Sequence, residues 1–328
     1  MKFLIPNYCV PDSFVDNVSF TLRATGHEVI TLPPVDNKTL TSPYLRVLRK
    51  TLNTLTGTEI TPQEKWLLAN FKALKPDVVL TLTQPLAGDT LTILKDYHIK
   101  TIVWWGDTAA NMKGKGILDE GWDLIFIKDG YAAHKLKTLG LPAFQLFEAM
   151  NPAWHKPLAE QQNNNLIIAG TFYDYRHFLT RRLLKDKVAL ELYGGRLPAW
   201  SDAEIKAIHT GKYVVREEKS RVFGAGMGVL NSTAMSEFDS VNCRAFEVAG
   251  TGALQIMEYR PAIEQCFEPG KEILVYKSYD ELLELIERAI KYPAEMKKIR
   301  EAGLKRAINE HTYRHRLEFI LKKLQELK

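Results

Sequence analysis

Short apolar runs alternate along the chain with segments in which apolar residues recur every three to four positions. The short runs are typical of buried parallel strands, and the longer period is typical of amphipathic helices. Strands separated by helices form βαβ crossovers, so the pattern predicts an α/β protein with parallel sheets. The expected strands are KFLIP (2–6), HEVITL (27–32), DVVLTL (77–82), KTIVWW (100–105), DLIFI (123–127), AFQLF (143–147), LIIAG (166–170), VALELYG (188–194), GVLNS (228–232), ALQIM (253–257) and EILVY (272–276).

One segment interrupts this alternation. NPAWHKP (151–157) contains two prolines and no periodicity, and the alternation restarts only after the polar run EQQNNN. The length of 328 residues also suits two domains. We therefore expect two Rossmann-like domains with parallel sheets facing a cleft, at residues 1–150 and 158–310. The linker is 151–157, and a closing helix at 311–328 is expected to pack back on the first domain.

Local signals mark several helix ends. Ser13 is a plausible N-cap, and Gly26 suits the position just after a helix. Residues 42–56 and 62–74 carry apolar positions at helical spacing, and the chain is helical from Tyr279 on. The glycines of GAGMG precede a strand instead of following one, so they do not indicate a dinucleotide-binding loop.

The charge pattern narrows the choice of partner. The net charge of +5 is spread, with 17 Lys/Arg and 15 Asp/Glu up to Pro157 and 27 and 24 beyond it. Nucleic-acid binding usually needs a clustered basic patch, so this balance counts against it. The basic segment YLRVLRKTL (44–52) suggests weak membrane-surface association, or a solvated helix face.

The three cysteines and the N-terminal residues indicate the cellular compartment. Cys9, Cys243 and Cys266 form no CxxC pair and no metal-ligand spacing, which suits reduced thiols in the cytoplasm. The start MKFLIPNYCVPDS is expected to be a strand and its turn rather than a signal peptide. No window approaches the ~18 apolar residues of a membrane span.

Charged residues follow two strands of the second domain, where α/β proteins bind ligands. In NCRAFEVAGTGALQIMEY (242–259), Arg244 and Glu247 share one helix face, and Asp239 lies near the helix entrance. The free N–H groups of that helix start would bind an anion, and the carboxylates would bind sugar hydroxyls. A salt-bridged structural helix is the alternative.

A second cluster follows strand 166–170. In GTFYDYRH, Gly170 permits a close approach of the backbone, and Arg176 stands at the start of the next helix. A phosphate at this position would meet a cation and helix N–H groups together. The alternative is a solvated surface arginine.

Three segments of the second half closely resemble the CgeB-like (spore-maturation) glycosyltransferases, relatives of the retaining GT-B glycosyltransferases. These are NCRAFEVAGTGA, EYRPAIEQCFEPGKEILVYKSYDELLELI and AGLKRAINEHTYRHRLEFIL. The resemblance is dense over roughly 226–320. It is looser at IAGTFYDYR and, in the first half, at VWWGDT, FIKDGYAAHKLKTLG and LFEAMNPAWHKP.

The resemblance implies roles for individual residues. Glu247 matches the glutamate that binds the donor ribose, and Asp239 the first acid of an acidic-x₇-Glu motif that contacts the donor sugar. Arg176 matches a cation on the diphosphate, with Gly170 beside it. Asn242 and Arg244 match an N-x-R that contacts the donor. Asp107 stands where relatives often have an acid facing the acceptor.

Two departures from the family affect the donor site. Asp239 replaces the usual glutamate, which shortens the reach to the sugar and leaves the donor's identity open. Thr171 stands where many retaining relatives have a second cation. The diphosphate is therefore expected to depend more on Arg176, Arg244 and the helix start.

The expected function is a metal-independent, retaining transfer of sugar from a nucleotide sugar to a glycan, protein, small molecule or DNA. No D-x-D motif occurs, and arginines with a helix dipole can stabilise a leaving diphosphate. No cofactor is expected, and a UDP-sugar is the leading donor because it is commonest among relatives. A phage-type DNA glycosyltransferase and a nucleotide-sugar-binding pseudoenzyme are the alternatives.

Overall fold

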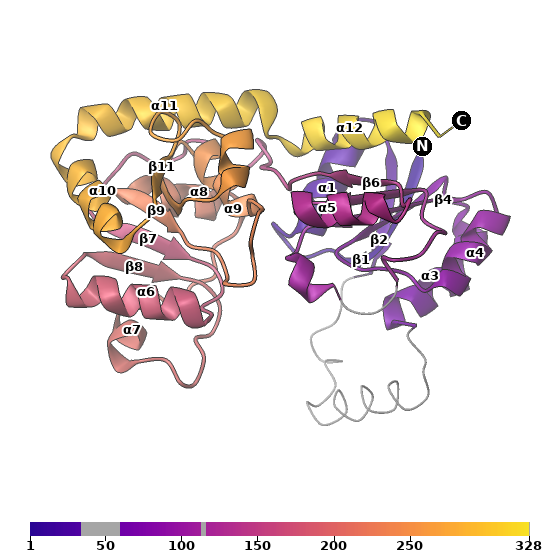
Figure 1. The fold of residues 1–328 in the computed structure, drawn as a ribbon, viewed down its shortest axis with the longest axis horizontal. Coiled ribbons are helices and arrows are strands. Elements are labelled where there is room, and N and C mark those ends of the chain that lie inside the picture. The colour runs from indigo at the N-terminus through magenta and orange to yellow at the C-terminus, as the bar shows by residue number, and fades with distance from the viewer. Residues whose placement is uncertain (34–59, 113–115, 328) are drawn as a thin grey trace. The chain divides into compact units, whose positions relative to one another are not determined.

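The computed structural model describes residues 1–33, 60–112 and 116–327 of the chain. The chain divides into two compact units (Figure 1). Unit 1 consists of Met1–Leu146 and Leu317–Lys328, and unit 2 consists of Phe147–Arg316. The helix predicted at 42–56 and the basic segment 44–52 lie outside the described residues.

Unit 1 contains a six-stranded sheet in the order β2-β1-β3-β4-β5-β6. Every paired strand runs parallel to its neighbour, as the βαβ pattern predicts. The strands β3 and β4 bury nearly all of their side chains, and β1 buries those of its middle part, which explains their continuous apolar sequences. The strands are β1 (Lys2–Tyr8), β2 (Glu28–Leu32), β3 (Val78–Leu82), β4 (Lys100–Trp105), β5 (Leu124–Ile127) and β6 (Ala143–Gln145).

Helices connect the strands of unit 1. Ser13 caps α1 by accepting a hydrogen bond from Asp16 N, and Gly26 follows that helix with φ of 85°. The closing helix packs against this unit: the ring of its Phe319 contacts the rings of Phe126 and Phe144. The helices are α1 (Phe14–Ala24), α3 (Pro62–Leu74), α4 (Gly88–Asp96), η2 (Ala109–Asn111), α5 (Gly130–Thr138) and α12 (Tyr313–Gln325), of which Leu317 onward belongs to unit 1.

Unit 2 contains a five-stranded parallel sheet in the order β11-β10-β9-β7-β8. The switch in order at β7 and β9 brings the ends of these two strands side by side. In open α/β sheets such a switch point is where ligands bind, beyond the carboxyl ends of the strands. The strands are β7 (Leu166–Ala169), β8 (Leu190–Tyr193), β9 (Gly228–Asn231), β10 (Gln255–Glu258) and β11 (Leu274–Tyr276).

Two apolar layers cover this sheet. One joins α6 and α10 to the strands through Leu179, Leu183 and Leu282, and the other packs Phe246 of α9 against Phe267. Figure 1 shows α6 on one side of the sheet. The helices are α6 (Asp174–Lys185), α7 (Ala203–Ile208), α8 (Arg216–Ala225), α9 (Cys243–Gly250), η3 (Pro261–Gln265), α10 (Tyr279–Lys291) and α11 (Pro293–Glu310).

The predicted α/β fold with two parallel sheets is confirmed, and each expected strand is present with its ends shifted by a few residues. The segment 151–157, expected as a linker, falls inside unit 2. Trp154 and His155 are buried there, and Ser220 Oγ donates a hydrogen bond to Trp154 O over 2.7 Å. The prediction of a cleft between the sheets stays a prediction. Among the described helices, none is both long and apolar enough to span a membrane.

Candidate functional site

Six of the seven predicted site residues lie in unit 2, and each of the six follows the carboxyl end of a strand. Parallel strands all end at the same edge of the sheet, which is why residues far apart in sequence gather there. Gly170 follows β7, and Arg176 lies in the first turn of α6. Asp239, Asn242, Arg244 and Glu247 follow β9, in the connection to α9 or in α9 itself.

Gly170 brings two arginines together. Its φ of 121° favours glycine. A Cβ atom built on it would lie 3.0 Å from Nη1 of Arg176 and 3.2 Å from Nη1 of Arg244. Gly194 is equally constrained, because a Cβ there would overlap the carbonyl oxygen of Gly170. Two guanidinium groups therefore lie beside a bare backbone at the end of β7.

The guanidinium of Arg176 is held rigidly by neutral oxygens. Nε donates to Ser232 Oγ over 3.0 Å, and Nη1 donates to Thr171 O over 2.6 Å. Nη2 donates to Tyr173 Oη over 2.9 Å and to Ser232 O over 2.6 Å. These bonds use four of the five N–H groups of the side chain, so one on Nη1, beside Gly170, is left for another acceptor.

The electrostatics of Arg176 are unfavourable without an anion. Only 6% of the residue is exposed. Burial lowers its pKa to about 10, and the nearby charge of Arg244 also lowers it, while Tyr173 acts in the opposite direction. Among the described residues, no carboxylate lies within 4.0 Å of this guanidinium. An anion bound beside Gly170 would relieve the repulsion between the two cations.

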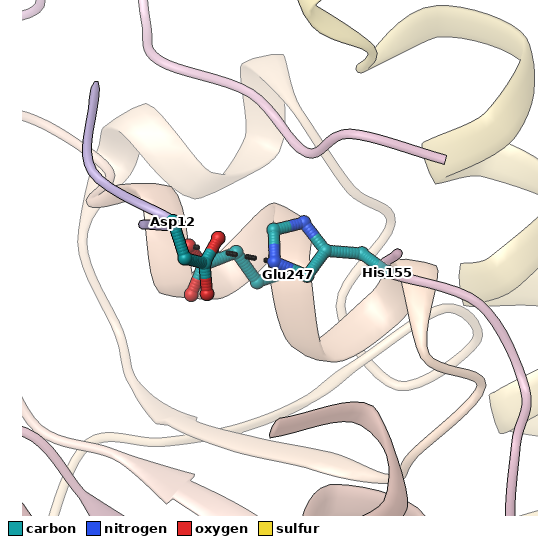
Figure 2. A group of neighbouring side chains, drawn as sticks. All are labelled: Asp12, His155 and Glu247. Atoms are coloured by element: carbon teal, nitrogen blue, oxygen red, sulfur yellow. Dashed lines mark ion pairs between the residues drawn. The ribbon is translucent and has the colours of Figure 1, made fainter. Parts of the chain in front are cut away.

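Glu247 lies in a buried cluster of charged and ionisable groups. Its Oε2 is 3.1 Å from Nζ of Lys219 and 3.7 Å from Nε of Arg244, one helical turn away. Oε1 is 4.0 Å from Nε2 of His155. Figure 2 shows the His155 ring beside the Glu247 carboxylate; Asp12, also labelled there, belongs to unit 1.

Among the charged groups whose contacts are given above, cations outnumber the carboxylate. Arg176, Arg244 and Lys219 are cations, and Glu247 is the anion paired with two of them. Lys219 is 6% exposed and Glu247 is 3% exposed, so water screens these charges weakly. The two guanidinium groups beside Gly170 suit an anionic ligand. His155 and Glu247 are of the residue types that also ligate metals.

Asn242 and Asp239 have defined structural contacts. Asn242 caps α9: its Oδ1 accepts from Ala245 N over 3.2 Å, and its side-chain amide exchanges two hydrogen bonds with that of Asn231. Asp239 Oδ1 accepts from Ala262 N over 3.0 Å, at the start of η3. The structure records no bond from Asp239 to Arg176 or Arg244 within the described part of the chain.

Asp107 lies in unit 1, after β4. Its Oδ1 accepts from Thr108 N over 2.7 Å, and Oδ2 accepts from Asn111 Nδ2 over 2.8 Å. These bonds stabilise the turn that leads into η2, and the carboxylate is partly exposed. The role on the acceptor side that the family resemblance implies for Asp107 stays a prediction.

Sequence reasoning missed Lys219 and His155, and it left open whether Arg176 was a surface residue. Lys219 belongs to the polar run REEKSR, which is typical of a solvated helix. The available signal was its spacing of four residues from Phe223, which places both on one face of α8. His155 lies in the segment predicted to be a linker, and no local pattern marks it as buried.

A family model and several solved structures are similar to this chain. A family model described as "Glycosyl transferase-like" matches residues 176–322, which include Arg176, Asp239, Asn242, Arg244 and Glu247. This match confirms the predicted class of enzyme, a glycosyltransferase. No curated protein matches the chain.

Solved structures share the fold over the whole chain. Sucrose-phosphate synthase from Thermosynechococcus elongatus has a TM-score of 0.68 and 14% identity, covering 100% of this chain and 99% of its own. A glycosyltransferase from Rickettsia africae has a TM-score of 0.65 and 12% identity, covering 99% and 98%. Anabaena HepE, in complex with UDP and glucose, has a TM-score of 0.66 and 10% identity, covering 99% and 100%. The predicted GT-B type of fold is thereby confirmed.

Proposed function

We propose that unit 2 binds a nucleoside diphosphate sugar and that the enzyme transfers the sugar to an acceptor without a metal ion. The observation that carries this proposal is the pair of guanidinium groups beside Gly170, one of them buried and without a carboxylate partner among the described residues. A diphosphate is the anion that fits best, because guanidinium groups match phosphate oxygens in geometry and charge.

The arginines would act chiefly on the leaving group. When the bond between sugar and diphosphate breaks, negative charge grows on the departing oxygen. Arg176 is already fixed by Ser232, Thr171 and Tyr173, so it needs no reorganisation as that charge develops. With retention of configuration, the departing oxygen can itself accept the acceptor's proton. No separate general base is then required.

The carboxylates would orient the donor. Glu247 is assigned to the ribose hydroxyls, and Lys219 acts as a positioning residue by fixing its carboxylate over 3.1 Å. Asp239 is assigned to the donor sugar, with Asn242 and Arg244 beside it, and Asp107 to the acceptor side. These roles follow the resemblance to CgeB-like glycosyltransferases, with which we group the chain, and a cytoplasmic location belongs to the same proposal.

UDP is the proposed nucleotide. HepE from Anabaena, which shares the fold, is solved with UDP and with UDP-glucose, at 10% and 12% identity to this chain. The selectivity for the base would arise in unit 2 near the end of β8. The acceptor is a glycan, protein, small molecule or DNA, and a nuclease-sensitive labelled product would identify DNA.

A thermal-shift panel of UDP, GDP, CDP, ADP and TDP in EDTA tests the proposal. A ligand that binds only the folded state adds about 2.7 kcal/mol of stability at a hundredfold excess over Kd. Each kcal/mol raises the midpoint by about 2–4 °C for 150–250 residues. We expect UDP to give the largest shift, and Tyr131→Phe, an exposed change in unit 1, to preserve it.

Arg244→Met tests which residues hold the nucleotide, since it removes the charge beside Gly170 and preserves most of the side-chain volume. We expect the UDP shift to be lost in the folded variant. No shift with any nucleotide at millimolar concentration would contradict the donor site. Binding without transfer or hydrolysis would instead favour a pseudoenzyme, and activity that needs added Mg²⁺ or Mn²⁺ would contradict metal independence.

A further inference from the structure

A pocket lies in unit 2, where β10 and β11 end. Its volume is about 450 Å³, and it is bounded by α6 on one side and the start of α10 on the other. The rings of Tyr175, Phe178, Tyr259, Tyr276 and Tyr279 contribute to its walls. No residue of the cluster around Gly170 lines it, so it is distinct from the donor site proposed above.

Two buried polar atoms of this pocket have no hydrogen-bond partner among the described residues: Oη of Tyr276 and Oε2 of Glu258. Tyr276 is 5% exposed. Burial raises the pKa of both side chains. Buried hydroxyl and carboxylate groups nearly always have a partner in native proteins, and leaving one unbonded is costly. A donor and an acceptor that lack partners in one pocket indicate a ligand with hydroxyl groups.

Two cations lie among the aromatic residues of the pocket. Cζ of Arg182 is 3.8 Å from the centre of the Tyr279 ring, and Nζ of Lys277 is 4.4 Å from the centre of the Tyr259 ring. Neither cation has a carboxylate within 4.0 Å in the described part of the chain. Both side chains are solvent-exposed, so each is available to pair with a negatively charged group of a ligand.

We propose that this pocket binds a sugar bearing a carboxylate or phosphate group. A pyranose ring has apolar C–H faces that stack on aromatic rings, and hydroxyls that both donate and accept hydrogen bonds. Glu258 would accept from one hydroxyl, and Tyr276 would donate to another. Lys277 and Arg182 would pair with the anionic group. A nucleobase would use the aromatic walls but would form no ion pair with these two cations.

The pocket borders the loop that carries Asp239. Glu258 Oε1 is 3.5 Å from Nη2 of Arg260, whose guanidinium donates to Glu237 O over 3.0 Å and to Thr233 Oγ1. A sugar held against Glu258 would therefore lie beside this loop, which connects β9 to α9. The pocket can hold a saccharide next to the donor site while remaining a separate site.

Isothermal titration of the full chain with glucuronic acid, glucose 6-phosphate, glucose and uridine tests the proposal. We expect saturable binding of at least one of the two anionic sugars, at least tenfold tighter than glucose. The stronger of the two identifies carboxylate or phosphate as the preferred group. No binding at millimolar concentration, equal binding of glucose, or tighter binding of uridine would overturn the proposal.

Two variants assign the binding to this pocket. Tyr276→Phe removes only the unbonded hydroxyl, so the fold is expected to persist, and binding should weaken about five- to tenfold. Glu258→Gln should weaken it about tenfold or more, because the bond to a charged acceptor is lost. The matched control Tyr131→Phe changes an exposed tyrosine of unit 1 and should leave it unchanged. Equal affinity in all three variants would place the sugar elsewhere.

The titration with anionic sugars reports on this pocket and does not depend on nucleotide binding at the donor site. Tyr276→Phe should preserve the thermal shift by UDP, and Arg244→Met should preserve binding of the anionic sugar. Loss of sugar binding in Arg244→Met, with Tyr276→Phe unaffected, would overturn the proposal of a separate pocket.

Discussion

Two arginines of unit 2, the buried Arg176 and the partly buried Arg316, have similar hydrogen-bond partners and opposite surroundings. Arg176 donates to Thr171 O and Ser232 O. Arg316 donates from Nε to Phe147 O over 3.1 Å and from Nη1 to Glu310 O over 3.0 Å. Burial lowers the pKa of both. By their hydrogen bonds and the direction of their pKa shifts alone they would be assigned the same role.

Their neighbours separate the two roles. Beside Arg176 lie a second guanidinium and a glycine with no side chain. Beside Arg316 lie the Phe246 ring, at 5.4 Å, and His311, whose Nδ1 accepts from Nη2 over 2.9 Å. Around Arg176, two positive charges lie beside a backbone that no side chain covers, which suits a bound anion. Around Arg316, the rings of Phe246 and His311 occupy the adjacent space, which suits a structural role.

The largest expected effect concerns the carboxylate that offsets the charge around Arg176. Glu247→Ala removes the buried carboxylate that lies 3.1 Å from Nζ of Lys219, and breaking a buried ion pair by removing one member typically costs about 3–5 kcal/mol. The free energy of unfolding, measured in urea, should fall by that amount. The control Glu310→Ala removes an exposed partner of Arg306 and should cost about 1 kcal/mol or less. Equal losses would mean that the buried cluster is not electrostatically coupled.

The two arginines themselves give the next largest effect. Arg176→Ala should lower kcat by about 10²–10³, because charge on the leaving diphosphate grows in the transition state. Arg316→Ala should reduce thermal stability while kcat per folded molecule stays close to that of the wild type. UDP release from UDP-glucose measures both. A normal kcat with a raised KM in Arg176→Ala would assign the residue to ground-state binding instead.

The sequence predicted the strands well because buried parallel strands are continuous apolar runs. LIIA of β7 and VVLTL of β3 are buried at every position, so their signal does not depend on tertiary context. The pair Arg244 and Glu247 was also visible, because three-residue spacing on a helix fixes their proximity.

Contacts between distant segments were not predictable in this way. Lys219 and Glu247 are 28 positions apart, and only the packing of α8 near α9 makes them an ion pair. Tyr276 and Glu258 look like ordinary ends of two strands. Their unbonded atoms become apparent only when α6 and α10 enclose the pocket. Sequence periodicity locates elements, whereas such pairs depend on side-chain packing across the sheet.

The smallest of these effects is a pH dependence at His311, next to Arg316. Its Nε2 lies 2.7 Å from Cys266 O, and Nδ1 accepts from Arg316, so the buried ring is the neutral tautomer. Burial, helped by the charges of Arg316, Arg306 and His315 and opposed by the bond to Cys266, lowers its pKa to about 3.

Because the unfolded chain has a histidine pKa near 6.5, it binds more protons than the folded state between about pH 6.5 and pH 3. The contribution of His311 to stability is therefore complete above this range and is lost as the pH falls through it. From pH 7 to pH 5 the loss should be about 2 kcal/mol. Urea unfolding at the two pH values measures it. His311→Gln, which has no titrating ring, should show a correspondingly smaller decrease, and equal decreases in both proteins would show that His311 is protonated without cost.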